Sequence, residues 1–232
     1  MDDVRRAIRY DSEEKSQHRI AAAITPEFID GIMPDFMKQL SAAQPHVQLA
    51  VRLGDFYECM HMVAEGAHHL DYGFVMLPQA FLEQTRMQAF LADHGLHVEP
   101  LCHTRLMVTV SRDSPLAQRN EVSLEEMLTH PAVIYKTDLD TSWHRIALAP
   151  YGSLRLGFIS GAWRLCDHYI AGHEDVFGFS NNACWPSREH CRQLRLRETL
   201  WEEVVLVSRE ETEMTGMVRE LFRAVCGRHI EA

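Results

Sequence analysis

Thr25 and Pro26 stand directly after a run of small apolar residues, Arg19–Ile24. A threonine followed by a proline is typical of a helix start, where the proline occupies the first turn. Backbone amides at a helix start lack partners and lie at the positive end of the helix dipole, so they attract a carboxylate. We therefore expect Thr25 and Pro26 to help bind a small anion, with helix capping by Thr25 as the alternative.

Asp55 and Met76 end two further segments of strand character. Asp55 follows Gly54, after the alternating apolar and polar residues of Val47–Leu53. An aspartate at this place attracts an amine or a hydroxyl group and repels a dianion, and its alternative role is to cap the next helix. Met76 ends the segment Leu70–Met76 and offers an apolar contact to a ligand, unless it packs only in the core.

In the second half of the chain, polar residues again follow predicted strands. Ser160 and Gly161 precede a predicted helix, so they offer a second helix start. Two helix starts that face one site favour an anionic small molecule as the ligand. Trp163 would add an aromatic wall or pack in the core. The ligand-binding candidates from this half are Lys136, Thr137, Ser160, Gly161, Trp163, Ser180 and Asn181.

The elements that must position these residues alternate between strand and helix. Apolar residues recur at steps of three and four from Ile29 to Leu40, which predicts a helix. This helix lies between the predicted strands Arg19–Ile24 and Val47–Leu53, and another helix precedes the strand Leu70–Met76. Two such crossovers imply a parallel sheet with helices on its faces. Ligands of such sheets bind at the carboxyl ends of the strands.

The second half of the chain repeats this alternation of strand and helix, and a closing strand and helix then suggest that the chain crosses back to the first half. Strand candidates occur near 132–135, 156–159 and 175–179, and an amphipathic helix spans Met214–Val225. The fold class that follows is α/β, with two subdomains joined by two crossover segments and an interdomain cleft. We assign 1–17 to a tail or the end of a linker helix, 18–104 and 203–232 to subdomain I, and 105–202 to subdomain II.

Composition and charge narrow the function classes. The formal net charge of −10 opposes binding of nucleic acid by this chain itself. No apolar run reaches the ~18 residues of a membrane span, and the polar N-terminus does not resemble a secretion signal. The six cysteines form no CxxC pair, which favours reduced thiols and a cytoplasmic protein.

Motifs for metal binding and catalysis are missing from the sequence. The 14 histidines do not show the spacing of zinc fingers or zincins. The sequence also lacks a GxSxG nucleophile elbow, a Walker motif and a GxGxxG loop. We therefore expect no metal, no cofactor and no enzymatic activity.

The order and spacing of several short motifs resemble the effector-binding domain of LysR-type transcriptional regulators. The similarity runs from about Arg19 to Cys226, but 138–151 and 181–190 lack clear family motifs, and the link at 67–69 is longer than usual. The matching motifs are Met33-Pro34, Pro45-His46-Val47-Gln48-Leu49, Gly54-Asp55, Glu65-Gly66 before Leu70-Asp71-Tyr72-Gly73-Phe74, Arg105–Val110 leading into Ser114-Pro115-Leu116-Ala117, and Leu124-Glu125-Glu126-Met127-Leu128 before Pro131.

The resemblance implies two Rossmann-like subdomains in a fold of the type II periplasmic-binding-protein kind, a small-molecule effector in the cleft, and a homodimer or tetramer. It also implies that DNA is contacted only through an N-terminal winged helix-turn-helix domain that this chain lacks, and that no membrane is involved. Residues 1–17 match only the end of the family's linker helix. The alternatives are a stand-alone cytosolic solute-binding protein and a small-substrate enzyme of the same fold.

Overall fold

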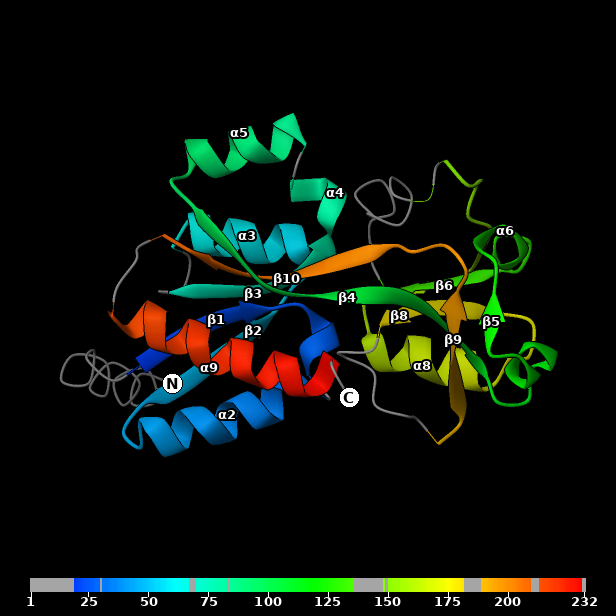
Figure 1. Ribbon diagram of the computed structural model, residues 1–232, viewed down its shortest axis with the longest axis horizontal. Coiled ribbons are helices and arrows are strands. Elements are labelled where there is room, and N and C mark those ends of the chain that lie inside the picture. The colour runs from blue at the N-terminus through cyan, green and yellow to red at the C-terminus, as the bar shows by residue number, and fades with distance from the viewer. Residues whose placement is uncertain are drawn as a thin grey trace, which may run out of the picture.

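Two lobes lie side by side in the computed structural model, and each is a β-sheet covered by helices (Figure 1). This arrangement confirms the predicted α/β class. We call the lobe that contains the first strand subdomain I and the other lobe subdomain II; the predicted residue boundaries between them stay predictions. The structure describes residues 19–29, 31–66, 70–82, 84–135, 148, 150–181, 189–209 and 213–230.

Subdomain I is built on a five-stranded sheet in the order β2-β1-β3-β10-β4. β1 pairs parallel with β2 and β3, whereas β10 runs antiparallel to β3 and β4. The elements are β1 (Arg19–Ile24), η1 (Pro26–Phe28), α2 (Ile32–Ala43), β2 (Gln48–Leu53), α3 (Phe56–Ala64), β3 (Tyr72–Pro78), α4 (Gln79–Leu82), α5 (Thr85–Asp93), β4 (His97–Ser111), β10 (Trp201–Ser208) and α9 (Glu213–Ile230).

Subdomain II is built on a second sheet in the order β5-β9-β4-β8-β6-β7. β6 pairs parallel with both β7 and β8. Ser123 precedes α6 as its N-cap, and its hydroxyl oxygen accepts from the Glu126 amide at 3.1 Å. The elements are η3 (Pro115–Gln118), β5 (Glu121–Val122), α6 (Leu124–Met127), β6 (Ala132–Tyr135), β7 (Leu156–Ser160), α8 (Trp163–Ala171), β8 (Phe177–Asn181) and β9 (Cys191–Leu196).

β4 is a 15-residue strand that belongs to both sheets. Its residues 97–105 pair with β10, and its residues 106–111 pair with β8 and β9. β10 starts at Trp201, opposite Arg105, at the same point along β4. β4 and β10 are therefore the two segments that cross between the subdomains, and they are visible as the long green and orange arrows of Figure 1.

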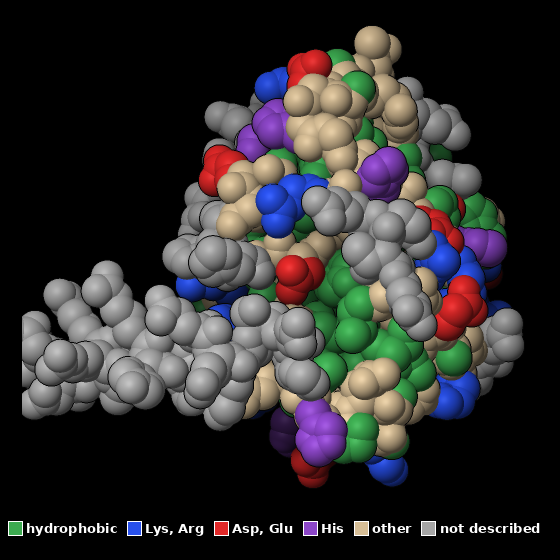
Figure 2. All heavy atoms as spheres, turned by 90° about the vertical axis from the view of Figure 1, so that its left-hand side faces the viewer, with side chains coloured by type: hydrophobic (Ala, Val, Ile, Leu, Met, Phe, Trp, Pro, Cys, Tyr) green, Lys and Arg blue, Asp and Glu red, His purple; other side chains and the backbone are tan. Residues whose placement is uncertain are grey.

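The main core of subdomain I lies between its sheet and the helices α2 and α9. Phe222 of α9 stacks on Phe74 of β3 with 4.0 Å between ring centroids, and meets Phe28 and Phe36 edge-on at 5.5 and 5.2 Å. α3, α4 and α5 cover the opposite face of the sheet (Figure 1). Figure 2, seen from the end of subdomain I, shows hydrophobic side chains gathered on the lower half of that end.

Three elements differ from the sequence-based expectation. The composition of 81–94 predicts one helix, whereas the structure has two, α4 and α5. Apolar residues at 98–101 and 106–110 predict two separate strands, but both segments belong to one strand, β4, in which Pro100 lies beside a break in register where a missing amide is tolerated. Pro34 predicts a kink or a restart inside the first long helix, but α2 starts at Ile32, so the proline lies in its first turn. The sequence also predicts a helix over 142–149, most of which falls outside the described residues.

Within the described part of the chain, no helix is long and apolar enough to cross a membrane. The cysteines described there, Cys59, Cys102, Cys166, Cys191 and Cys226, are all free thiols.

We predict that Phe222→Ala lowers the free energy of unfolding by about 3–5 kcal/mol, because it removes a buried ring that three other phenylalanines contact. Urea titration followed by circular dichroism measures this loss. Lys38→Ala, on the exposed side of α2, is the matched control and should change stability little. A loss below about 1 kcal/mol for Phe222→Ala would contradict the assigned core.

Candidate functional site at the subdomain junction

Thr25 lies between β1 and η1, at the carboxyl end of the first strand, as predicted. Its surroundings differ from the prediction in two ways. The Thr25 amide is not free, since it donates to the Phe74 carbonyl at 3.2 Å. The Thr25 hydroxyl does not cap η1, and instead accepts from the Met76 amide at 3.3 Å. Pro26, in the first position of η1, has no amide to offer, so this helix start is a poor anion site.

Asp55 acts as the N-cap of α3, which was the alternative left open by the sequence. Its Oδ1 accepts from the amides of Tyr57 and Glu58 at 2.8 and 3.0 Å, and Glu58 Oε2 accepts from the Asp55 amide at 2.8 Å. This reciprocal capping box places two carboxylates at the start of α3. Both carboxylates already bind backbone amides that a ligand carboxylate would need.

Met76 and Asn181 meet at the junction between the subdomains. The Asn181 side-chain amide, at the end of β8, donates to Met76 Sδ at 2.8 Å and to Glu202 Oε2 at 2.9 Å. Glu202 is only 5 % exposed and opens β10 beside the crossing point. The pKa of Glu202 is raised to about 8, mainly by burial; the Asn181 hydrogen bond acts against this rise, and the negative charge of Glu27 adds to it. Asn181 therefore contacts Met76, which the sequence analysis also predicted for the site, and Glu202, which it missed.

Glu27 is the second acidic residue that the sequence analysis missed at this junction. It lies in η1, two residues after Thr25, and its Oε2 atom is inaccessible to solvent without a hydrogen-bond partner. Burial raises the pKa of Glu27 and the charge of Asp55 adds to this, while hydrogen bonds from its own amide and from Thr25 act in the opposite direction. The Thr25 hydroxyl and the Glu27 amide are therefore used by an internal carboxylate.

Tyr135 brings subdomain II close to these carboxylates. It ends β6, and burial raises its pKa to about 12, with further contributions from the negative charges of Glu27, Glu58 and Asp55. The same three carboxylates raise the pKa of the buried Cys59 thiol, after the larger effect of burial. The phenol and the acidic groups of subdomain I therefore lie within electrostatic range of each other across the junction.

Two neutral hydroxyls at the junction are buried without a hydrogen-bond partner. The first is Thr104 Oγ1. Thr104 lies on β4 directly opposite Glu202 of β10, so the two side chains lie on the same face of the sheet. Ser180 Oγ precedes Asn181 on β8 and is likewise unpaired. Thr104 and Ser180 are 1 % and 4 % exposed, and a buried hydroxyl without a partner carries a desolvation cost.

The remaining candidates of subdomain II divide into two groups. Ser160 ends β7 and accepts from the Ala162 amide at 3.0 Å, and Gly161 is exposed just before α8. The helix start there is therefore partly occupied by Ser160 itself. Lys136 and Thr137 lie outside the described residues, and the side chain of Trp163 is not described either.

Two cavities lined by described residues lie away from the junction. One of about 660 Å³ is in subdomain I, between α5 and the strands β4 and β10, and one of about 270 Å³ is in subdomain II, beside α8 and β9. No three histidine, cysteine, aspartate or glutamate side chains of the described residues come together in a way that would hold a metal ion.

Signals for the missed residues are weak but present in the sequence. Glu202 precedes the apolar run Val204–Val207, and an acid next to a buried strand is unusual. Glu27 follows Pro26 in a predicted first helical turn, where an acidic residue is common and so attracts no attention.

Comparisons with known proteins agree with this architecture. Residues 13–165 match the family model described as LysR substrate binding domain. A search of curated protein sequences found no significant match.

Solved structures of LysR-type regulators share the fold. HinK, a LysR family transcriptional regulator from Pseudomonas aeruginosa, aligns with a TM-score of 0.71 and 15% identity over 96% of this chain and 76% of HinK. The BenM effector binding domain with its effector benzoate gives 0.70 and 14% over 91% and 93%. The reduced OxyR regulatory domain from Pseudomonas aeruginosa gives 0.68 and 10% over 91% and 97%. Because the family model covers more than half of the chain, this protein belongs to the LysR substrate binding domain family.

Proposed function

We propose that this chain is the ligand-sensing regulatory domain of a LysR-type transcriptional regulator, and that a small effector binds at the junction of its two subdomains. The observation that carries the proposal is the group of buried, unpartnered polar atoms at that junction: Glu27 Oε2, Thr104 Oγ1 and Ser180 Oγ. Native proteins pair nearly all such atoms, so a bound ligand is a natural partner for them. The role is sensory rather than enzymatic, and the protein acts in the cytoplasm.

The proposed mechanism uses β4 and β10 as the two connections whose bending changes the angle between the subdomains. An effector shifts this angle only if it binds one arrangement more tightly than the other. Asn181, Met76 and Glu202 touch one another at the crossing, so a ligand that competes for any of them alters contacts between the subdomains. The shift would then pass through an oligomer to DNA-binding domains that lie outside this chain.

An oligomer is favoured by apolar side chains on the surface. Met37 of α2 and Leu53 of the edge strand β2 are 47 % and 54 % exposed, and Leu165 of α8 is 55 % exposed. An exposed edge strand with apolar side chains is normally covered by a partner. We propose a homodimer or tetramer in which the β2 and α2 surface of one copy is covered by another copy.

The anionic effector expected from the sequence loses its main basis. That expectation rested on free amides at two helix starts, but Pro26 has no amide to donate and the Ala162 amide already donates to Ser160. The chemical class of the effector is derived below from the groups that remain unpaired.

Screening metabolites by thermal shift tests the sensory role. We expect at least one small molecule to raise the melting temperature with a dependence on concentration that follows its affinity, and to be recovered chemically unchanged. Small-angle scattering of the complex should show a changed radius of gyration. The absence of any stabilising compound in a broad library, or conversion of the compound into a product, would refute the sensory proposal.

Introducing a charge on β2 tests whether the β2 and α2 surface is an interface between copies of the chain. We predict that Leu53→Asp lowers the association state, because it places a charge in an apolar contact. Analytical ultracentrifugation measures this change. Gln118→Asp, exposed on η3 of subdomain II, is the control for a negative charge added away from this surface. Identical association states of the wild type and Leu53→Asp would show that β2 is not an interface.

Glu202 should make stability depend on pH. Its pKa is about 8 in the folded chain and near 4.5 when unfolded, so across that window the folded form keeps a proton that the unfolded form releases. The free energy of unfolding should fall as pH rises through the window, by at most about 1.4 kcal/mol per pH unit. Above the folded pKa of about 8, the contribution of the Glu202 proton to stability is lost completely.

Glu202→Gln should flatten this dependence, because the amide cannot ionise and still accepts from Asn181. Urea titrations at several pH values between the two pKa values measure the slopes, with Glu125→Gln as an exposed control. Equal slopes in the wild type and Glu202→Gln would contradict a protonated Glu202 at the junction.

A further inference from the structure

We infer that the effector carries a cationic nitrogen, an amine or a guanidine, and that the Glu27 carboxylate binds it at the junction of the subdomains. This deepens the proposed sensory function and rests on it. Nothing in the family match or in the solved relatives assigns such a ligand to this chain.

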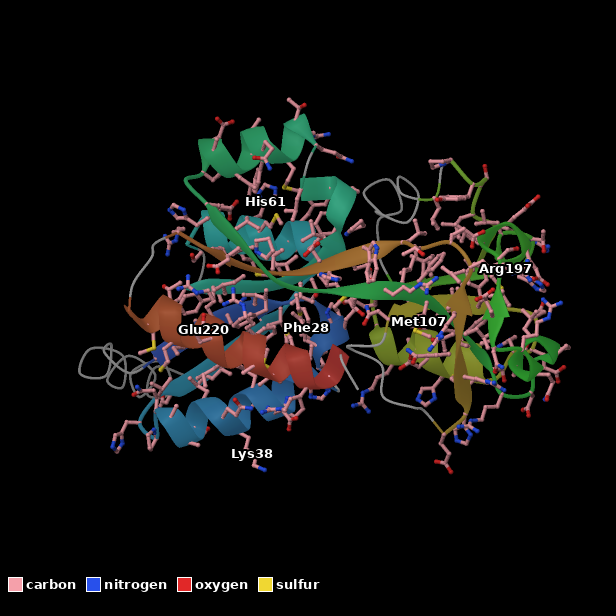
Figure 3. All side chains as sticks on the ribbon, viewed as in Figure 1. Phe28, Lys38, His61, Met107, Arg197 and Glu220 are labelled. Carbon is pink, nitrogen blue, oxygen red and sulfur yellow. The ribbon has the colours of Figure 1, made fainter. Side chains whose placement is uncertain are left out.

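The first observation is the state of the Glu27 carboxyl group. Glu27 Oε2 is inaccessible and accepts no hydrogen bond from the described residues, although a carboxylate oxygen is a strong acceptor. Figure 3 shows Phe28, the next residue, at the side of subdomain I that faces subdomain II. A cationic N–H donor from a ligand would fill this position with a charge-assisted hydrogen bond.

The second observation is the sign of the surrounding charge. Asp55 and Glu58 stand at the start of α3, and both of them, with Glu27, act on Tyr135 and Cys59 in the direction expected of negative charge. Glu202 also feels the charge of Glu27. Glu27, Glu58 and Glu202 take part in none of the ion pairs found among the described residues. A carboxylate ligand would be repelled here, and an ammonium ion would be attracted.

The third observation is the orientation of Arg105, the cation that β4 carries beside the crossing. Arg105 follows Thr104 on β4, so its side chain leaves the opposite face of the strand. Its guanidinium group donates to the Leu196 carbonyl at 2.7 Å, within subdomain II. The cation of β4 is therefore directed away from the Thr104 and Glu202 face.

The rest of the ligand would meet neutral polar groups. Thr104 Oγ1, which shares the face of Glu202, is buried and unpaired, and a hydroxyl is able to donate or to accept. Glu202 has a pKa of about 8, so it is mainly protonated at neutral pH. These groups suit a ligand whose remaining polar atoms are uncharged.

Matched pairs of amines and carboxylates test the inference. The probes are benzylamine against benzoate, and 1,5-diaminopentane against glutarate, each titrated into the full chain with thermal shift as the readout. We expect the amines to raise the melting temperature in a saturable way and the carboxylates to leave it unchanged. Glu27→Gln should weaken amine binding by about tenfold or more, because it removes the charge and keeps the shape.

Two control variants accompany Glu27→Gln. Glu125→Gln removes an exposed carboxylate far along the chain and should bind the amines as the wild type does. Glu27→Met, of similar size, replaces Glu27→Gln if the latter fails to fold.

Three results would overturn the inference. Stabilisation by the carboxylates, retained in Glu27→Gln and lost in Lys136→Gln, would assign an anionic ligand and leave the sensory role intact. Amine binding that is equal in the wild type and in both Glu27 variants would place the amine elsewhere. No shift with either pair would also reject the cationic class, and the metabolite screen would then judge the sensory role separately.

Discussion

The hydrogen bonds of Asn181 are the contact on which the arrangement of the two subdomains depends. One side-chain amide at the end of β8 reaches Met76 on β3 and Glu202 on β10, so it joins both subdomains at the point where the chain crosses between them. The crossing itself has little freedom, because β4 continues through both sheets without interruption. Any change in the angle between the subdomains must therefore alter this contact or bend β4 and β10 beside it.

Burial of carboxyl groups gives the junction its chemical character. Glu27 and Glu202 are both removed from water, and neither has a cationic partner in the ion pairs of the described chain. Glu202 avoids a buried charge because its raised pKa lets it keep its proton. Glu27, by contrast, has one buried carboxyl oxygen without a hydrogen-bond partner. Such a group is costly in the ligand-free protein, and that cost is recovered when a ligand supplies the missing donor.

The sequence predicts the architecture well, because strand and helix periods depend on neighbouring residues. β1 spans the predicted Arg19–Ile24, and the parallel pairing of β1 with β2 and β3 follows from the crossovers. The site is harder to predict, because it depends on long-range pairing. The sequence predicts Thr25 as a helix cap, but its hydroxyl accepts from the Met76 amide, 51 residues away. Asn181 contacts Glu202 only because β8 and β10 both pair with β4. Lys136 and Thr137 stay predictions.

The most direct test of the central claim is the distance between the subdomains with and without an effector. Spin labels at Lys38 on α2 of subdomain I and Arg197 after β9 in subdomain II (Figure 3), both exposed, report this distance by pulsed electron resonance. The account predicts that saturation with a stabilising amine moves the distance distribution, and that Glu27→Gln does not respond. A distribution that stays the same at saturation would contradict a sensor that works through the crossing of β4 and β10.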